Sequence, residues 1–548
     1  MATLATTILS VLVGISLAGS DGTRASQQVP AEHHIVPSVG VGDYTLGMSR
    51  NEVLKKLGEP ESIEREENQV VRRGEEKYDI KNLPRECILG FGDISFRLTD
   101  ESVQTIFVRS SLYTFSNGSG VGDSEPNIKQ VFGENYRVEQ ATGRHYLCYD
   151  AQGVGFAIDE KTKAATEIVV YPKKEKPKEW TTIPKYDPNS NNPFQVDLRA
   201  RDLSKLDLSA SLGDLMYAAF DDRTVWPAPE RMPAGFDWRK IMELGRNPGL
   251  GVRRLHKEGI TGRGVRIAII DQPLLADHQE YADRVCFYEE VDLPGRRNPA
   301  MHGAAVASIA LGKTVGVAPE AELYYIARPG GSPLQRQARC IHRIIEVNAQ
   351  LPQDNKIRVI SMSTGWGPSR EGYEDITEAV RKAQAAGMLL VCTSVEQVHE
   401  GCDFDALDRP PLADPDVFES YEPGLFRARD FWSHPPSPSG MCFSVPMDSR
   451  TTASPAGIDE YVFYRIGGFS WAVPYIAGVY ALAVQADPAI TPERFWALAV
   501  RTGRTIELNR GGVTRPLGPI VDPVRLIRAI QAGETTTLNR QPSEGMAK

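Results

Sequence analysis

The strongest constraint on the fold is a series of short apolar segments in the second half of the chain, which alternate with helical patterns. Residues 265–270 form a β-branched run, and residues 358–362 and 388–392 form two further runs, with a helical stretch at 376–386 between them. Strands that are apolar on both faces and alternate with helices predict an α/β domain with a doubly wound, mainly parallel sheet. In such sheets the ligand site lies beyond the carboxyl ends of the strands. We therefore expect functional residues directly after these segments.

The first third of the chain contains two segments that resemble each other. Ser49 and Glu52 form a capping box at the start of a predicted helix that ends at Gly58, and a second helix with the same spacing of glycines ends at Gly133. Runs with the composition of β-strands follow each helix. We predict a smaller, duplicated α+β module over residues 43–172.

Changes in composition divide the rest of the chain. Residues 173–195 are rich in Lys, Pro and Asn, which predicts a linker. Residues 196–239 alternate Asp with Leu and then become rich in Pro and aromatic residues, so we expect a lead-in arm that packs on the next domain. The parallel-sheet domain is expected over residues 240–530, and a disordered tail over residues 531–548. A chain of 548 residues is long enough for several such domains.

The net charge, the N-terminal residues and the cysteines bear on which partners the protein binds and on where in or outside the cell it is located. The net charge of -9 offers no basic surface for a nucleic acid. An apolar run at residues 4–17 is followed by small residues, which predicts a signal peptide over residues 1–26 and export to the cell envelope or the medium. No later stretch has the length of a membrane span. The seven cysteines lack CxxC pairs, so no zinc site is predicted, and their odd number keeps a cytoplasmic location as the alternative.

Three polar residues are the candidates for chemistry. Asp271 follows the first strand, His302 begins a run of small residues, and Ser470 precedes an apolar helix. Each of them alone has a structural explanation, as a cap, a packed imidazole or a helix N-cap. Gly262 and Gly264 precede the strand, whereas a dinucleotide fingerprint needs its glycines after the strand, so a Rossmann-type site is excluded.

Together, these segments resemble the signatures of the subtilisin-like serine peptidases, the subtilases, in the chain order Asp, His, Ser. Each motif is weak alone, but five of them in one order form a specific pattern. The matching segments are 259–265, 302–308, 316–319, 360–365 and 467–474. Residues 240–530 are therefore identified as a divergent member of this family.

The resemblance implies a role for each candidate. Ser470 would attack a peptide carbonyl, His302 would take and return the proton, and Asp271 would orient the imidazole. The substrate would be a protein or peptide, and neither a redox cofactor nor a catalytic metal would be needed. Three consecutive residues would line the cleft and pair with the substrate main chain as an added strand: Ser363, Thr364 and Gly365.

Several positions depart from the family pattern. Gln272 and Pro273 stand where the family places a small hydroxyl residue and Gly, and Phe469 replaces the Thr before the nucleophile. An ungapped count places Glu396 in the slot of the oxyanion-hole Asn, and a carboxylate donates a hydrogen bond only when it is protonated. The alternative donors are Gln397, Thr393 and Ser394, together with the backbone amide of Ser470.

One acidic segment raises the question of a bound ion. Residues 403–422 are acidic and rich in Pro, which predicts a surface insertion. Their carboxylates leave room for a structural calcium ion, although no EF-hand spacing is present.

The sequence as a whole predicts a serine endopeptidase that acts through an acyl-enzyme. The leading alternative is a catalytically impaired binding or scaffold protein with the subtilase fold, and a third hypothesis is an esterase or amidase. By its position, the N-terminal region would restrain the peptidase until it is removed, as propeptides do in this family.

Overall fold

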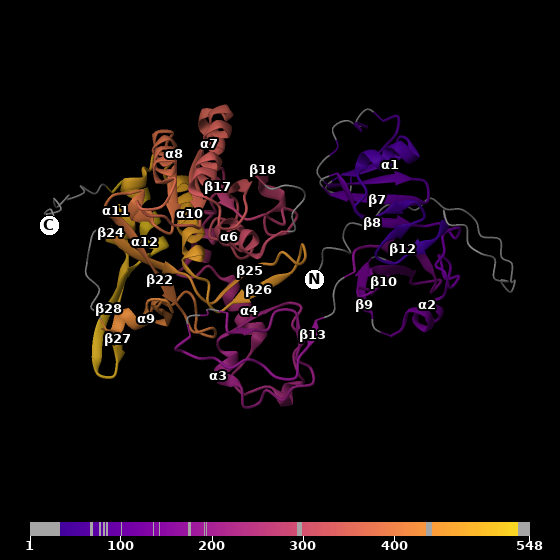
Figure 1. Ribbon diagram of the computed structural model, residues 1–548, viewed down its shortest axis with the longest axis horizontal. Helices are drawn as coiled ribbons and strands as arrows, with labels where there is room; N and C mark the ends of the chain where they lie inside the picture. The colour runs from indigo at the N-terminus through magenta and orange to yellow at the C-terminus, as the bar shows by residue number, and fades with distance from the viewer. Residues whose placement is uncertain are drawn as a thin grey trace. The chain divides into compact units, whose positions relative to one another are not determined.

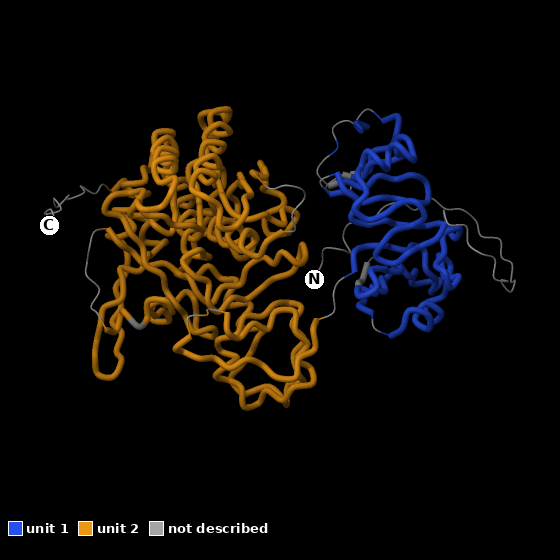
Figure 2. The backbone as a smooth tube through the Cα atoms, viewed as in Figure 1, with its two compact units in different colours: residues 1–176 blue, residues 177–548 orange. Residues whose placement is uncertain are grey.

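The computed structural model describes residues 33–534 except for short gaps at 66–68, 76–77, 81–82, 84–85, 100, 135, 142, 174–176, 191, 193, 293–298 and 434–440. The predicted signal peptide at residues 1–26 and the predicted tail beyond residue 534 lie outside this part of the chain. The chain divides into two compact units, residues 1–176 and 177–548 (Figure 2).

The first unit is a nine-stranded antiparallel sheet with two short helices (Figure 1). Val53 and Ile128, one on each helix, are fully buried in the same core as Phe96 and Phe156. The helices are α1 (Arg50–Leu57) and α2 (Glu125–Phe132), and the strands are β4 (Ser62–Arg65), β5 (Gln69–Arg72), β6 (Glu86–Phe91), β7 (Ile94–Thr99), β8 (Ser102–Val108), β9 (Arg137–Ala141), β10 (Arg144–Tyr149), β11 (Val154–Asp159) and β12 (Ala165–Val170). Three short strands form a separate small sheet: β1 (Ile35–Val36), β2 (Gly40–Val41) and β3 (Tyr44–Thr45).

The order of the large sheet is β5-β4-β6-β7-β8-β12-β11-β10-β9, so that β8 and β12 join the two helix-and-strand halves. The predicted capping box of α1 is confirmed, because Ser49 Oγ accepts from Glu52 N at 3.3 Å and Glu52 Oε2 accepts from Ser49 N at 2.9 Å. Ser124 makes no equivalent side-chain cap on α2. The duplication itself stays a prediction.

The second unit contains the predicted parallel sheet, in the order β18-β19-β17-β20-β21. All of its strand pairs are parallel: β17 (Arg266–Asp271), β18 (Val285–Glu290), β19 (Glu322–Ala327), β20 (Ile357–Met362) and β21 (Leu389–Cys392). Side chains alternate between the two faces of β17. Ile267 and Ile269 pack in the core that contains α6 (Met301–Leu311) and α10 (Phe469–Ala486). Ala268 and Ile270 pack in the core that contains α7 (Leu334–Gln350) and α8 (Tyr373–Ala385).

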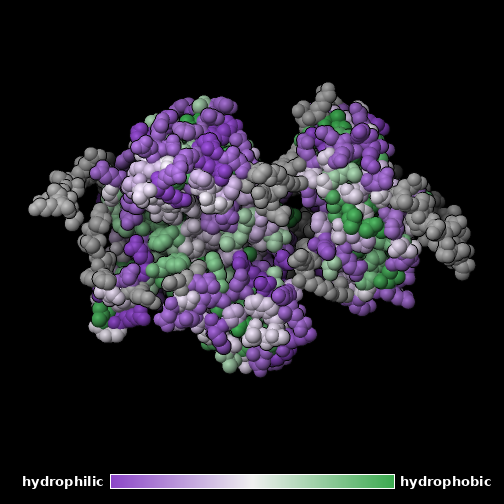
Figure 3. Space-filling model, in the orientation of Figure 1, coloured by the Kyte–Doolittle hydropathy of each residue, from purple (hydrophilic) through white to green (hydrophobic). Residues whose placement is uncertain are grey.

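Both faces of the central sheet are therefore covered by helices, as the α/β prediction requires (Figure 1). The surface of the second unit over α7 and α8 is strongly hydrophilic in the space-filling view (Figure 3). These two helices thus bury an apolar face and expose a polar one, which is typical of the outer layer of a soluble domain.

Further sheets and helices surround this core. A five-stranded sheet has the order β23-β22-β24-β28-β27, and a four-stranded sheet has the order β14-β16-β26-β25. Their strands are β14 (Val196–Asp197), β16 (Ala218–Asp221), β22 (Cys402–Asp408), β23 (Glu422–Pro423), β24 (Met441–Pro446), β25 (Arg450–Ala453), β26 (Tyr461–Tyr464), β27 (Arg504–Arg510) and β28 (Val513–Ile520). The remaining helices are α3 (Leu212–Leu215), α4 (Trp238–Arg246), α5 (Val252–Lys257), α9 (Ala428–Ser433), α11 (Pro492–Thr502) and α12 (Pro523–Gln531).

The structure differs from the predicted division of the chain in three respects. Part of the predicted linker at 173–195 packs against the second unit, since β13 (Lys178–Glu179) pairs with β15 (Arg201–Asp202) and Ile183 is buried. The second unit therefore begins at Pro177 rather than at residue 240. The predicted surface insertion at 403–422 begins with β22, which pairs in parallel with β24 and alternates buried and half-buried side chains.

Candidate active site

Asp271 and His302 form a hydrogen-bonded pair. Asp271 is the last residue of β17 and is 2% exposed, and its Oδ1 lies 2.6 Å from His302 Nδ1. An ionised carboxylate only accepts hydrogen bonds, so Nδ1 carries the proton in this contact. The other ring nitrogen of His302, Nε2, is then left with a lone pair that accepts a proton.

Gly303, near the start of α6, allows this helix to lie close to the segment that follows β17. A Cβ atom on Gly303 would lie 2.5 Å from the carbonyl oxygen of Gln272 and 2.7 Å from the hydroxyl of Tyr325. Only glycine lets α6 approach the segment after β17 this closely. Tyr325 also donates a hydrogen bond of 2.5 Å to the Gln272 carbonyl, which fixes the turn that follows Asp271.

Burial, a hydrogen bond and two charges set the pKa of His302. Burial lowers the pKa of His302, but the charge of Asp271 and the hydrogen bond to it raise the pKa, and the balance leaves it above the usual histidine value. The guanidinium of Arg328 acts in the opposite direction and lowers this pKa. The imidazole is thus a stronger base than an isolated histidine.

Ser470 is the second residue of α10, and the helix is preceded by Gly468, whose positive φ of 75° favours glycine. Its backbone N–H lies in the first turn, where helical N–H groups have no acceptor within the helix and favour negative charge. The ring of Trp471, the next residue, lies 5.4 Å from that of His302, centroid to centroid. No hydrogen bond joins Ser470 Oγ to His302 Nε2, both of which belong to the described residues. Such contacts are often long without substrate.

Pro474 and Ser363 act together on the carbonyl of Ser470. This carbonyl would normally accept from the N–H four residues later in the helix, but Pro474 has no N–H. Ser363 Oγ donates to it instead, at 2.9 Å. The segment after β20 is thereby tied to the helix that carries Ser470.

A pocket of about 120 Å³ opens beside the Asp–His pair. Ser363 and Thr364, to which the resemblance assigns substrate binding, line this pocket, whereas Gly365 does not. A Cβ on Gly365 would come within 2.6 Å of the hydroxyls of both Thr393 and Ser394. The other lining residues are Asp271, Gln272, His302, Arg328, Gly330, Gly331, Ser332, Gln337 and Arg370.

The candidates for the oxyanion hole lie after β21 but do not line this pocket. Thr393 stays close to the cleft, because its N–H donates to the Thr364 carbonyl at 3.0 Å. Gln397 accepts a 3.4 Å hydrogen bond from the Tyr373 hydroxyl through Oε1, which turns its amide toward α8. Glu396 is exposed. The donor assignment therefore stays a prediction.

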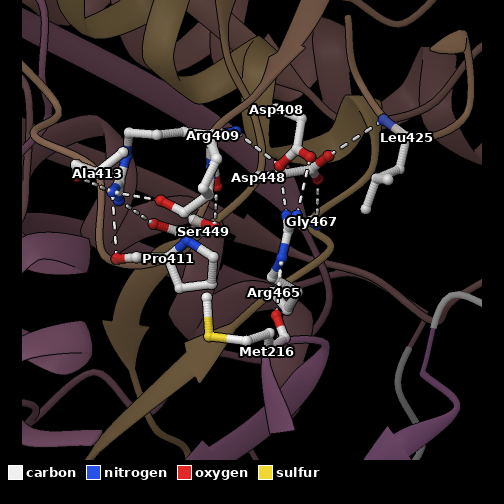
Figure 4. A network of polar contacts seen from close by, with 11 residues as sticks. Met216, Asp408, Arg409, Pro411, Ala413, Leu425, Asp448, Ser449, Arg465 and Gly467 are labelled. Atoms are coloured by element: carbon white, nitrogen blue, oxygen red, sulfur yellow. Dashed lines mark hydrogen bonds and ion pairs between the residues drawn. The ribbon is translucent and has the colours of Figure 1, made fainter. Parts of the chain in front are cut away.

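A buried ionic network supports the turn before Ser470, and sequence reasoning missed it (Figure 4). Asp448 Oδ1 accepts the N–H of Gly467 at 2.8 Å, and Oδ2 accepts that of Leu425 at 3.4 Å. Next to it, Arg465 forms a two-pronged ion pair with Asp408, and the two side chains are 6% and 5% exposed. The one signal in the sequence was a charge, Arg465, directly after the apolar run of β26, since a buried charge needs a partner.

The surroundings of Asp448 raise the pKa of its carboxyl group. Burial, followed by the charge of Asp408, raises the pKa of Asp448 to about 8, while Arg465 and the two backbone N–H groups lower it. Arg465 also donates from Nε to the carbonyl of Met216 at 3.1 Å. The network thus connects the predicted lead-in arm with the residues just before Ser470.

Two further features bear on the predicted cofactors and partners. Within the described residues, no group of three or more His, Cys, Asp or Glu side chains is arranged to hold a metal ion. One described helix, α10, is long and apolar enough to cross a membrane, but 78% of it is buried inside the unit and it carries Ser470. The seven cysteines form no disulfide.

Comparison with known proteins agrees with the resemblance seen in the sequence. The pattern of the subtilase family, Peptidase_S8, matches residues 262–401, which include Asp271 and His302. The subtilisin-like protease PopC of Myxococcus xanthus is 27% identical over 291 residues, which are 48% of this chain and 60% of that protein. A thermostable alkaline protease of Halalkalibacterium halodurans is 27% identical over 252 residues, 44% of this chain and 63% of that protein.

The chain thus spans less than two thirds of the length of these two relatives. An intracellular serine protease of Paenibacillus polymyxa is 30% identical over 264 residues, which are 45% of this chain and 76% of that protein. The family pattern, the relatives and the parallel sheet with Asp271 at a strand end agree, and the chain belongs to the subtilase family.

Proposed function

We propose that residues 177–548 hydrolyse peptide bonds as a serine endopeptidase, with Asp271, His302 and Ser470 as the triad. The observation that carries the proposal is the 2.6 Å hydrogen bond between Asp271 and His302, beside the helix start that holds Ser470. The names of the relatives, all of them proteases, support the reaction class.

The reaction proceeds in two halves. Ser470 Oγ attacks the scissile carbonyl carbon while His302 Nε2 takes the hydroxyl proton, and Asp271 stabilises the resulting imidazolium. The C–N bond breaks when His302 gives the proton to the leaving amine, and the acyl group stays on Ser470 as an ester. Water, deprotonated by His302, then releases the acid and regenerates the serine.

Negative charge on the carbonyl oxygen needs donors. The N–H of Ser470 supplies one, at the positive end of α10. The second comes from the segment after β21, from Gln397, Thr393 or Ser394 rather than from the carboxylate of Glu396. Loss of one such donor costs on the order of 10² to 10³ in rate. The substrate main chain pairs with Ser363, Thr364 and Gly365 as an added strand.

The triad needs no redox cofactor and no catalytic metal, and a calcium ion would serve stability only. Export through a signal peptide stays a prediction, as does restraint by the N-terminal unit. One relative is named as an intracellular enzyme, so the cytoplasmic alternative stays open.

A fluorophosphonate probe tests the proposal, because it labels only an activated serine. We expect labelling of the wild-type protein, none of Ser470→Ala, and much slower labelling of His302→Ala. Ser209→Ala serves as the matched control, since this serine is exposed and far along the chain from the site. Wild-type protein that has not been treated with the probe should also cleave casein in preference to small esters, which separates a peptidase from an esterase.

The alternative function is a binding or scaffold protein that has kept the fold without activity. The absence of a hydrogen bond between His302 and Ser470, together with Glu396 in the donor slot, favours it. Folded protein that no fluorophosphonate labels, with or without residues 1–176, would decide for this alternative.

A further inference from the structure

Arg328 is a buried cation without a carboxylate partner. It directly follows β19, it is 5% exposed, and its backbone N–H donates to the Asp271 carbonyl at 2.7 Å. Its Nη1 donates to the carbonyl of Pro329 at 3.1 Å, while its Nε has no partner. No carboxylate among the described residues forms an ion pair with it. A buried charge without a counterion is strongly disfavoured, because it has lost its hydration without gaining a partner.

The carboxylates of Asp271 and Asp292 have other partners. Asp271 Oδ1 bonds to His302 Nδ1 and accepts the N–H of Gln272 at 2.7 Å. Asp292 is paired with Arg336 and Arg339. Neither carboxylate forms an ion pair with Arg328, although ordinary proteins pair a buried arginine.

This cation borders the pocket beside the active site. His302, Ser363 and Thr364 line the same pocket, and so does Arg370, whose Nη1 donates to the Gly365 carbonyl at 3.1 Å and whose side chain is exposed. The pocket thus has two guanidinium groups against one carboxylate, and that carboxylate is bonded to the histidine.

A second unsatisfied atom lies in the same wall. Gln337 is 1% exposed, its Nε2 donates to the Ser332 carbonyl at 2.9 Å, and its Oε1 has no partner. Buried polar atoms without partners are rare, and two of those found in the described residues belong to side chains that line this one pocket. An amide ligand would suit Gln337 but would leave the cation unpaired, and a hydrogen bond to a charged group is the stronger one.

We propose that this pocket receives an acidic side chain of the peptide substrate, whose carboxylate pairs with Arg328 and, at the mouth, with Arg370. The inference rests on the proposed peptidase function and adds its specificity. A peptide that lies along Ser363 and Thr364 places one side chain, near the scissile bond, between these residues and His302. Glutamate or aspartate at that position supplies the missing counterion.

The first experiment uses the full-length wild-type enzyme and fluorogenic peptides that differ at one position. Glu, Gln and Leu are compared at each of four positions before the scissile bond and two after it. We expect kcat/KM for Glu to exceed that for Gln and Leu on the order of 10- to 100-fold at one position, and the ratio to fall with salt. Equal rates for Glu and Leu, or a preference for Gln, at every position would overturn the proposal.

Substitutions at Arg328 and Arg370 test whether the preference for Glu comes from this pocket. Because the Glu-to-Leu ratio is taken within each variant, a general loss of activity cancels. We expect Arg328→Met to bring the ratio near one, Arg328→Lys to keep part of it, and Arg370→Gln to lower it less. Arg381→Gln, an exposed arginine on α8 outside the pocket, serves as the control and keeps the wild-type ratio.

A binding measurement separates this inference from the peptidase proposal. Ser470→Ala protein is titrated with the labelled Glu, Gln and Leu peptides, and fluorescence anisotropy gives each Kd. We expect the Glu peptide to bind on the order of 10-fold more tightly than the Gln peptide, and the difference to vanish in Ser470→Ala with Arg328→Met. Selective binding without any turnover would reject the peptidase and retain the pocket, whereas turnover without acidic preference would do the reverse.

Discussion

Asp448 holds the backbone N–H of Gly467 at 2.8 Å, three residues before Ser470. The same carboxyl group accepts the N–H of Leu425 and stands beside the buried pair of Asp408 and Arg465 (Figure 4). The turn before the proposed nucleophile is thus stabilised by Asp448, which does not line the pocket beside the Asp–His pair. Its removal should affect stability and activity together.

Asp448→Ala leaves two partly buried N–H groups without acceptors. We expect the free energy of unfolding to fall by about 2–4 kcal/mol, because each buried unsatisfied donor costs about 1–3 kcal/mol. Urea denaturation of the Ser470→Ala background, which prevents self-digestion, measures this loss. Asp354→Ala, on an exposed site, is the control and should stay within about 0.5 kcal/mol of its parent. A loss as small for Asp448→Ala would show that the network does not support this turn.

The raised pKa of Asp448 makes stability depend on pH. An unfolded aspartate ionises near pH ~3.9, whereas the pKa of Asp448 in the fold is about 8, so between these values the folded protein holds a proton that the unfolded chain has lost. The contribution of this group is complete below about pH 4 and is lost as the pH rises to about 8, at a slope of at most about 1.4 kcal/mol per pH unit. Denaturation series from pH 5 to 9 should show that the stability of Asp448→Asn relative to its parent increases with pH. A constant difference would contradict the assignment.

The pH profile of the peptidase reports on His302. The neutral imidazole is the active base, and the pKa of His302 lies above its usual value, so kcat/KM should fall on the acid side of a pKa above about 6.5. Asp271→Asn removes the charge that raises this pKa and also favours the wrong tautomer. We expect the acid limb to move to lower pH and kcat to drop on the order of 10⁴-fold. An acid limb that stays in place in Asp271→Asn would mean that another group titrates.

The parts of the fold set by local pattern could be predicted from the sequence. The strand that ends at Asp271 is apolar on both faces, because helices cover both sides of the sheet, and such a run is easily recognised. The small residues after His302 predict close helix packing, and Gly303 is in contact with the carbonyl of Gln272. For these two elements, the local residue pattern and the order of the family motifs were sufficient to predict the structure.

Features that depend on distant partners could not be predicted. The segment that forms β22 alternates Asp with apolar residues and looks like a surface loop until its parallel pairing with β24 is known. Arg465 pairs with Asp408, which lies 57 positions earlier in the sequence. No local spacing of residues predicts an ion pair between side chains so far apart in the chain. The donors of the oxyanion hole are uncertain for the same reason, because their geometry depends on how the segment after β21 lies against the cleft.

Removal of residues 1–176 should leave the second unit folded. The first unit has its own core around Phe96 and Phe156, and the second has its own cores on both faces of the parallel sheet. We expect residues 177–548 to unfold cooperatively with unchanged thermal midpoint and, if the N-terminal unit restrains the enzyme, to label faster with fluorophosphonate. Equal labelling of folded full-length and shortened protein would remove the support for restraint. Deletion to residue 239 is the matched contrast and should unfold the protein, because it removes β16 and the buried Phe220.

The link between Ser363 and Pro474 offers the sharpest test of the site's architecture. Ser363→Ala leaves the carbonyl of Ser470 without a donor, and we expect a loss of stability of about 1–3 kcal/mol together with a lower kcat. Pro474→Ala restores a helical N–H four residues after this carbonyl, so the same Ser363→Ala change should cost less in that background. A double-mutant cycle measures the difference directly. If Ser363→Ala costs the same with proline and with alanine at position 474, its hydroxyl does not replace the missing helical donor, and the proposed reason for the serine fails.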